Sequence, residues 1–303
     1  MSQQMEDTLA TLCEKAKAAA GLPVPPIDQS RADLLTFLAG FPEVPGVTIN
    51  PADAGGVDGE WTVPDEGEAH GAILYFHGGG FIQGAPVGHR RIVSTLSLNA
   101  GTRALSIDYR LAPENPYPAA LDDALTAYEW LIGDGGETPA DVVLAGDSAG
   151  ATLVAALLVR LRDENRPLPA GAFLISPATD IACTGESVTI RAHRDPLLSL
   201  EAMQMIAAAY VPQGADPLHP WISPHYADLA GLPPLLIHVG DNEVLLSDAE
   251  RLTGHAQAAG VDTELKIWDG AFHVFHNYLG IIPEADQALA EAGAWIKTVI
   301  TAP

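Results

Sequence analysis

Short apolar runs alternate with helix-length segments along most of this chain, from about residue 47 to the C-terminal end. Several runs are almost continuously apolar, as expected for strands that are buried on both faces. The alternation predicts an α/β fold, with a mostly parallel central sheet flanked by helices. The clearest expected strands are 72–76, 103–108, 142–145, 172–176, 235–239 and 264–268. Two to four more are expected before Gly71, including 47–50 and 60–63, and the expected helices are 88–99, 118–132, 149–162, 247–259 and 284–299.

Two stretches interrupt this alternation and are expected to form a helical cap over the sheet. Residues 1–41 read as two helices around a Gly/Pro-rich turn at 21–26, with Ser30 as the expected N-cap of the second. Residues 180–221 are too long for a plain loop and carry a helical pattern at 198–210. The expected organisation is one structural unit with N-terminal cap helices in 1–45, core in 46–179, a cap insertion in 180–221, and core again in 222–303.

The composition excludes some functions. At 303 residues and 48% hydrophobic content, the chain can bury a sizeable core. Its 39 acidic and 15 basic residues give a formal net charge of -24. Nucleic-acid binding depends on cations that neutralise phosphates, so no nucleic-acid partner is expected. An anionic membrane surface is disfavoured for the same reason.

The cysteines and the N-terminal sequence bear on the cellular location. Cys13 and Cys183 are far apart, so they form no metal-ligand cluster by themselves and a disulfide is not expected. The first residues lack the positive start and apolar segment of a secretory signal. The longest apolar run, 151–159, is far shorter than the roughly 20 residues of a membrane-spanning helix. We expect a cytoplasmic protein without stable membrane association.

The motif Gly146-Asp147-Ser148-Ala149-Gly150 lies between an expected strand and an expected helix. A sharp strand-to-helix turn needs small residues on both sides of its central residue, and the glycines meet that need. The Ser148 hydroxyl would stand clear of the backbone, at a helix N-terminus whose partial positive charge favours a developing oxyanion. The motif therefore predicts Ser148 as a nucleophile.

A second motif, His77-Gly78-Gly79-Gly80-Phe81, follows the expected strand 72–76. Consecutive glycines leave backbone N–H groups unshielded, so these groups can point at an oxyanion. The backbone amide of Ala149 is their expected partner donor.

With the run Asp108-Tyr109-Arg110-Leu111-Ala112-Pro113-Glu114, these motifs make the chain resemble the hormone-sensitive lipase family, also called bacterial family IV, in the α/β-hydrolase superfamily. The resemblance covers nearly the whole chain. It implies an oxyanion hole of Gly79, Gly80 and Ala149, and a role for His77 in bracing that loop. Asp147, beside the nucleophile, is expected to support the site without reacting, and the run around Tyr109 is expected to be scaffolding.

A serine nucleophile needs a base that accepts its proton near neutral pH, and histidine suits that role. In an α/β-hydrolase the chain order is serine, acid, histidine, with the histidine after the last strand. Among ten histidines this predicts His273 as the base, with nearby His276 as the alternative. A metal site built from these two lacks a convincing third ligand, so no metal is expected.

The acid should follow the strand 235–239, where Asp241, Glu243 and Asp248 compete. The commonest family pattern is aspartate-proline-leucine, and aligning Leu245 with that leucine selects Glu243. Asp241 is the second choice, and Asp248 is expected at a helix start. The tripeptide Asp195-Pro196-Leu197 resembles the pattern but precedes the penultimate strand, so a turn in the cap is its expected role.

These residues predict a serine carboxylesterase that hydrolyses short- to medium-chain esters through an acyl-enzyme, without metal or organic cofactor. A lactone hydrolase with the same triad is the alternative, and an amidase is less favoured. A ligand-binding homologue, like the plant gibberellin receptors, is disfavoured because those lose the triad histidine. The resemblance also allows a homodimer. The residues expected to line the substrate pocket are Phe81, Met203, Ile206 and Tyr210.

Overall fold

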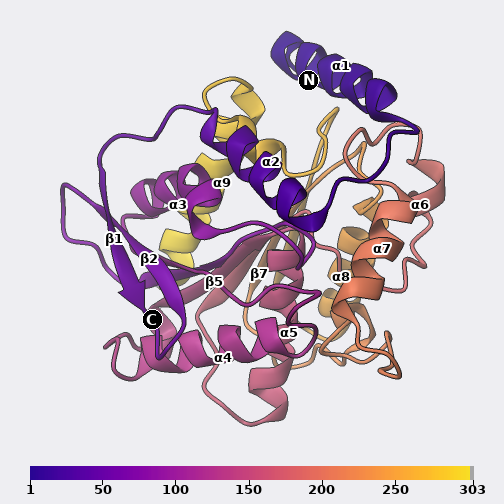
Figure 1. The fold of residues 1–303 in the computed structure, drawn as a ribbon. Coiled ribbons are helices and arrows are strands. Elements are labelled where there is room, and N and C mark those ends of the chain that lie inside the picture. The colour runs from indigo at the N-terminus through magenta and orange to yellow at the C-terminus, as the bar shows by residue number, and fades with distance from the viewer. Residues whose placement is uncertain (301–303) are drawn as a thin grey trace.

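The computed structural model describes residues 1–300, and an eight-stranded sheet forms their centre (Figure 1). The strand order is β1-β2-β4-β3-β5-β6-β7-β8, with β1, β2 and β4 paired antiparallel and the remaining neighbours parallel. The strands are β1 (Val47–Asp53), β2 (Asp58–Pro64), β3 (Ala72–Phe76), β4 (Arg103–Ile107), β5 (Val142–Asp147), β6 (Gly171–Ile175), β7 (Leu235–Gly240) and β8 (Thr263–Trp268). Together with the flanking helices, this confirms the predicted α/β fold.

Helices cover both faces of the sheet (Figure 1). They are α3 (Pro86–Ala100), α4 (Ala119–Ile132), α5 (Ala149–Asp163), α8 (Leu246–Ala258) and α9 (Pro283–Ile300). Successive side chains of a strand point to opposite faces. On β3, Leu74 and Phe76 belong to the cluster with α4, α5 and α8, whereas Ile73 and Tyr75 belong to the cluster with α3 and α9.

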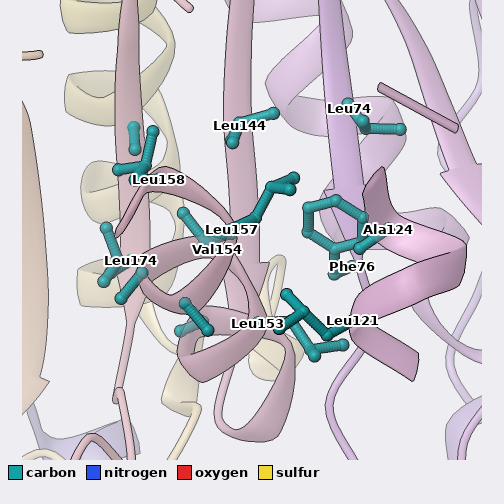
Figure 2. Close-up of a cluster of buried hydrophobic side chains, with 14 of the residues drawn as sticks. Leu74, Phe76, Leu121, Ala124, Leu144, Leu153, Val154, Leu157, Leu158 and Leu174 are labelled. Carbon is teal, nitrogen blue, oxygen red and sulfur yellow. The ribbon is translucent and has the colours of Figure 1, made fainter. Parts of the chain in front are cut away.

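The core on the α5 face is dense with leucine. Figure 2 shows Leu153 and Leu158 of α5, Leu121 of α4 and Leu174 of β6 within one cluster of buried side chains. Each of these side chains is almost completely buried. Burying such a side chain contributes about 1.5–3 kcal/mol. The packing fixes α5, and therefore the turn that precedes it, against the sheet.

The segments expected to form the cap, residues 1–45 and 180–221, contain α1 (Gln3–Ala19), α2 (Ile27–Ala39), α6 (Ser187–Ile190) and α7 (Leu200–Tyr210). The expectation that Ser30 caps the second helix is wrong, because α2 already begins at Ile27 and its N-cap is Pro26. Pro26 is held extended by its ring, and the Ser30 amide bonds to its carbonyl inside the first turn. The N-cap thus lies four residues before the expected serine.

Short 3-10 turns complete the described chain, at Pro139–Asp141, Pro224–Tyr226 and Phe275–Tyr278. Cys13 and Cys183 are both free thiols. Across residues 1–300, none of the helices has the length and apolar character needed to span a bilayer.

Candidate active site

Ser148 occupies a strained turn between β5 and α5. Its backbone, at φ 53° and ψ -120°, lies outside the regions that side-chain-bearing residues prefer. A side chain at Gly146 would put its Cβ 2.6 Å from the carbonyl carbon of Gly150, and one at Gly150 would collide with the Phe76 carbonyl oxygen. The two glycines are therefore required for strand β5 to turn into α5 at this point.

The ring of His273 lies between Ser148 and Glu243. Its Nε2 is 2.9 Å from Ser148 Oγ, and its Nδ1 is 2.9 Å from Glu243 Oε2. An ionised carboxylate only accepts hydrogen bonds, so Nδ1 carries the proton. That tautomer leaves the Nε2 lone pair free to accept the proton of the serine hydroxyl.

Glu243 is fully buried and held by two donors besides His273. Its Oε1 accepts hydrogen bonds from Ser176 Oγ at 2.7 Å and from the Gly240 amide at 2.6 Å. Asp241, the second choice, lies elsewhere in the same loop. Its carboxylate accepts the Gly270 amide at 2.8 Å and faces Arg194 at 3.3 Å. Of the two, Glu243 is the carboxylate that contacts the histidine.

The other acid and base candidates lie apart from Ser148. Asp248 is buried in the first turn of α8, where its Oδ2 accepts the Asp180 amide at 2.9 Å and burial raises the pKa to about 7. His276 is fully buried, 3.3 Å from His238, and burial lowers its pKa well below the ordinary value.

The electrostatic surroundings favour a protonated His273. Burial by itself lowers the pKa of the ring, because it disfavours the charged form. The hydrogen bond and the negative charge of Glu243 outweigh that effect, with smaller contributions from Asp195 and Asp147, and the net pKa is raised above 6.5. An imidazolium formed at this position is therefore stabilised.

The glycine loop after β3 lies against Ser148. The Gly78 amide is already bonded to Asp147 Oδ1 at 2.9 Å, so it is not free to bind a ligand. Gly79 and Gly80 have positive φ angles of 125° and 63°, and both line the cavity that contains Ser148 and Ala149. Positive φ favours glycine, which accounts for the residue type at both positions.

Asp147 anchors this loop from below. Besides Gly78, its Oδ1 accepts the Tyr75 hydroxyl at 2.7 Å, and its Oδ2 is 3.5 Å from His89 Nε2. Burial alone would raise the pKa of Asp147, but the neighbouring His89 and the Tyr75 hydroxyl hold it below the ordinary value. The carboxylate is thus stable as an anion and can keep its bond to the loop.

His77 braces the same loop from the other side. Its Nδ1 donates to the Gly78 carbonyl at 2.8 Å, and its own carbonyl accepts the Tyr109 hydroxyl at 2.7 Å. The two rings stack with centroids 4.2 Å apart. Burial lowers the pKa of His77 to about 3, so the ring is neutral. The position of Tyr109 gives a physical reason for the motif that follows β4.

A cavity of about 350 Å³ opens beside Ser148 and is mostly apolar. Of the four expected lining residues, Phe81, Met203 and Ile206 line it. Tyr210 does not line it; its ring stacks on that of Phe81, with ring centroids 3.7 Å apart. Residues from α2 also contribute to the wall, at Leu34, Phe37 and Leu38.

The N-terminal segment was expected to help form the substrate pocket, but sequence reasoning missed Ser176 and the individual α2 residues that line the cavity. Ser176 is the first residue after the apolar strand β6, at the carboxyl edge of the sheet where Ser148 also lies. Parallel strands bring the residues that follow them together at one edge, so a polar residue there was a usable signal. No comparable pattern marks the α2 residues, because apolar residues on a helix predict only a buried face.

A model of the alpha/beta hydrolase fold family matches residues 73–277 of the chain. Among curated proteins, an acetyl-hydrolase of Streptomyces hygroscopicus is 45% identical over 239 residues, covering 79% of each chain. An esterase of Acinetobacter venetianus is 38% identical over 251 residues, covering 83% of this chain and 82% of its own.

Solved structures are similar over the whole chain. An esterase from the bacterial hormone-sensitive lipase family superposes with a TM-score of 0.93 at 40% identity, covering 99% of both chains. The esterase EstE5, in a crystal soaked with p-nitrophenyl butyrate, gives a TM-score of 0.94 at 39% identity and full coverage of both chains.

Proposed function

Since the chain belongs to the hormone-sensitive lipase family of α/β-hydrolases and is a carboxylic-ester hydrolase, we propose that Ser148, His273 and Glu243 form its catalytic triad. The observation that carries the proposal is the continuous hydrogen-bond chain from Ser148 Oγ through both ring nitrogens of His273 to Glu243. An activated nucleophile needs this arrangement of hydroxyl, base and orienting acid.

In the acylation step, His273 Nε2 takes the hydroxyl proton while Ser148 Oγ attacks the ester carbonyl carbon. The carbonyl oxygen becomes an oxyanion, which the amides of Gly79, Gly80 and Ala149 stabilise. Each such donor is worth about 10²- to 10³-fold in rate. His273 then gives its proton to the departing alcohol, and the acyl group remains on Ser148.

In the deacylation step, water takes the place of the alcohol. His273 accepts a proton from the water, the hydroxide attacks the acyl-serine, and the carboxylic acid leaves as Ser148 regains its proton. Glu243 stabilises the imidazolium in both steps and stays ionised. Asp147, His77 and Tyr109 do not touch the substrate in this scheme. They hold the glycine loop in place beside Ser148.

The substrates proposed are esters of short to medium acyl chains. The cavity beside Ser148 is small and mostly apolar, and it suits such a chain better than a charged group. The names acetyl-hydrolase and esterase carried by relatives favour open-chain esters over the lactones that the same triad could also cleave.

An ester panel tests this proposal. Wild type and Ser148→Ala are assayed with p-nitrophenyl esters of rising acyl length, including the butyrate used on a solved relative, and with several lactones. We expect butyrate or shorter esters to be hydrolysed best, and the variant to lose about 10⁴-fold or more in kcat. Hydrolysis that persists in Ser148→Ala would refute the mechanism, and preferred turnover of lactones would refute the substrate class.

The identity of the acid has its own test. Glu243→Ala is expected to lose about 10³- to 10⁴-fold in kcat, because the His273 tautomer and its imidazolium lose their partner. Asp241→Ala is the matched control from the same loop and should retain most activity. The opposite pattern, with Asp241→Ala alone inactive, would reject Glu243.

A homodimer and a cytoplasmic location are further proposals. Size-exclusion chromatography with light scattering tests the first, and cell fractionation tests the second.

A further inference from the structure

One carboxylate of the cap segment reaches the loop of the proposed triad acid. Asp195 is only 9% exposed and has no cationic partner among the ion pairs of residues 1–300. Its Oδ1 accepts the amides of Leu197 at 2.9 Å and Leu198 at 3.0 Å, which closes a turn. Its Oδ2 accepts the amide of Val244 at 3.0 Å, the residue directly after Glu243. The turn itself uses only Oδ1, so the bond from Oδ2 to Val244 is an additional contact.

We propose that Asp195 is a positioning residue for ester hydrolysis, joining the cap turn at Leu197 and Leu198 to the loop that presents Glu243. This rests on the proposed triad. Asp195 contacts neither Ser148 nor His273 and acts through the backbone on either side of it.

The two segments that Asp195 joins both belong to the site. Leu197 and Leu198 line the cavity beside Ser148, and the Val244 amide is one peptide bond from Glu243. The Val244 side chain is fully buried, and Glu243 is held on its other side by Gly240 and Ser176. Asp195 therefore ties one wall of the cavity to the carboxylate that orients the base.

The bridge depends on the residue at position 244. Valine stands where the aspartate-proline-leucine pattern has proline, and proline has no N–H to donate. A chain with proline there could not form this hydrogen bond. Val244→Pro therefore removes the bridge while leaving the Asp195 charge and its turn in place.

Asp195 also adds negative charge near the base. Glu243, Asp195 and Asp147 each raise the pKa of His273. His276 also interacts electrostatically with His273. Burial raises the pKa of Asp195 itself, while the nearby His273 and the amide donors of Val244 and Leu197 act to lower it. Removing the charge should therefore lower the pKa of His273.

The cap offers a matched control in a second Asp-Pro-Leu tripeptide at Asp216-Pro217-Leu218. Asp216 Oδ1 accepts the Leu218 amide at 2.9 Å, which is the same local turn. This turn is exposed, and none of the residues that line the cavity belongs to it. Asp216→Asn makes the same substitution in the same kind of turn, without affecting the hydrogen bond between Asp195 and Val244.

The experiment measures kcat, KM and the pH profile of kcat/KM with p-nitrophenyl butyrate for wild type, Asp195→Asn, Val244→Pro and Asp216→Asn. In Asp195→Asn, we expect kcat to fall about 10- to 100-fold, since a buried amide loses its acceptor. KM should change less, and the acidic limb of the kcat/KM profile should move to lower pH. Val244→Pro should lower kcat without moving the acidic limb of that profile. Asp216→Asn should have the kcat, KM and pH profile of wild type.

Circular dichroism and thermal melting identify a variant that does not fold. If Asp195→Asn does not fold, Val244→Pro is used to test the proposal. Wild-type kcat in a folded Asp195→Asn or Val244→Pro would overturn the proposal, as would an equal loss in Asp216→Asn. Ser148→Ala in the same assay separates the two hypotheses, because its failure to abolish hydrolysis would reject the triad rather than Asp195.

Discussion

At the scale of single residues, the site is a chain of hydrogen bonds in which each partner fixes the protonation state of the next. Glu243 can only accept, so His273 Nδ1 must donate to it, and Nε2 is left free for the Ser148 proton. Ser176 extends the chain, since its hydroxyl donates to Glu243 Oε1 and accepts the Val274 amide at 3.3 Å. Ser176 thus links the acid to the backbone next to the base.

Ser176→Ala should lower kcat about 10- to 100-fold with little change in KM. The reason is that Glu243 loses a hydrogen bond to a charged group, worth about 1.5–3 kcal/mol, when the imidazolium forms. Steady-state kinetics with p-nitrophenyl butyrate measure this.

Ser106→Ala is the control for Ser176→Ala. Ser106, in β4, is also buried, but its hydroxyl has no hydrogen-bond partner within the described residues. It should keep wild-type kcat. An equal loss of kcat in Ser176→Ala and Ser106→Ala would contradict the role assigned to Ser176.

The pH dependence of kcat/KM follows from the raised pKa of His273. Only the neutral ring can accept the Ser148 proton, so activity falls as the pH drops through that pKa. Because Glu243 raises the pKa above the ordinary 6.5, the acidic limb should have its midpoint above pH 6.5. A midpoint at or below 6.5 would contradict the electrostatic role assigned to Glu243.

At the scale of elements, Arg31 provides a hydrogen-bonded link between α2 and the core. Arg31 donates to the carbonyl of Ile82 at 2.8 Å and of Ala112 at 3.1 Å, and it pairs with Glu114 at 2.7 Å. Ile82 closes the turn after the glycine loop, and Glu114 belongs to the run around Tyr109. The same helix supplies Leu34, Phe37 and Leu38 to the cavity.

Arg31→Ala should therefore raise KM for longer acyl chains, by about 3- to 10-fold for p-nitrophenyl octanoate. The acetate ester, whose short chain needs less of the α2 wall, should keep kcat and KM within about twofold of wild type. The kinetics of both esters check this.

The control for Arg31→Ala is Gln29→Ala in the same helix, because within residues 1–300 the Gln29 side chain hydrogen-bonds only to exposed Asp33. It should leave both esters unchanged. A uniform loss of kcat across chain lengths in Arg31→Ala would indicate that Arg31 acts on the chemistry rather than on the cavity wall.

At the scale of the whole molecule, the parallel sheet gathers the site at one edge. Ser148 follows β5, Ser176 follows β6, Glu243 follows β7 and His273 follows β8. These strands are neighbours in the sheet order, so residues up to 125 positions apart in sequence come within hydrogen-bond distance. The sheet fixes which loops meet, and the loops supply the reacting groups.

The sheet and the loops that meet at its edge could be predicted from the sequence, because they depend on periodicity and on local turns. All eight strands and the helices of the core lie where the apolar runs placed them, with ends shifted by a few residues. Gly146 and Gly150 indicated the sharp turn between β5 and α5, since only glycine fits at these two positions. Aligning Leu245 with the family leucine selected Glu243, and the Glu243 carboxylate contacts His273 in the structure.

The contacts made by the cap could not be predicted in the same way. The local sequence predicts Asp195 only as a turn residue, and its hydrogen bond to Val244 joins residues 49 positions apart in the sequence. Tyr210 was expected in the cavity, but its ring stacks on that of Phe81. Such contacts depend on how the cap lies on the sheet, and helix periodicity does not specify that orientation.

The central claim is that Ser148 is the nucleophile activated by His273 and Glu243. An alkyl fluorophosphonate, which reacts with activated serine hydroxyls, tests it most directly through peptide mass spectrometry and residual esterase activity. We predict one phosphonyl group per chain, on the peptide that carries Ser148, with activity lost in proportion to labelling. Labelling should become much slower in His273→Ala and Glu243→Ala but not in Asp241→Ala. Full labelling of Ser148 with esterase activity retained, or loss of activity with the label on another residue, would contradict the account.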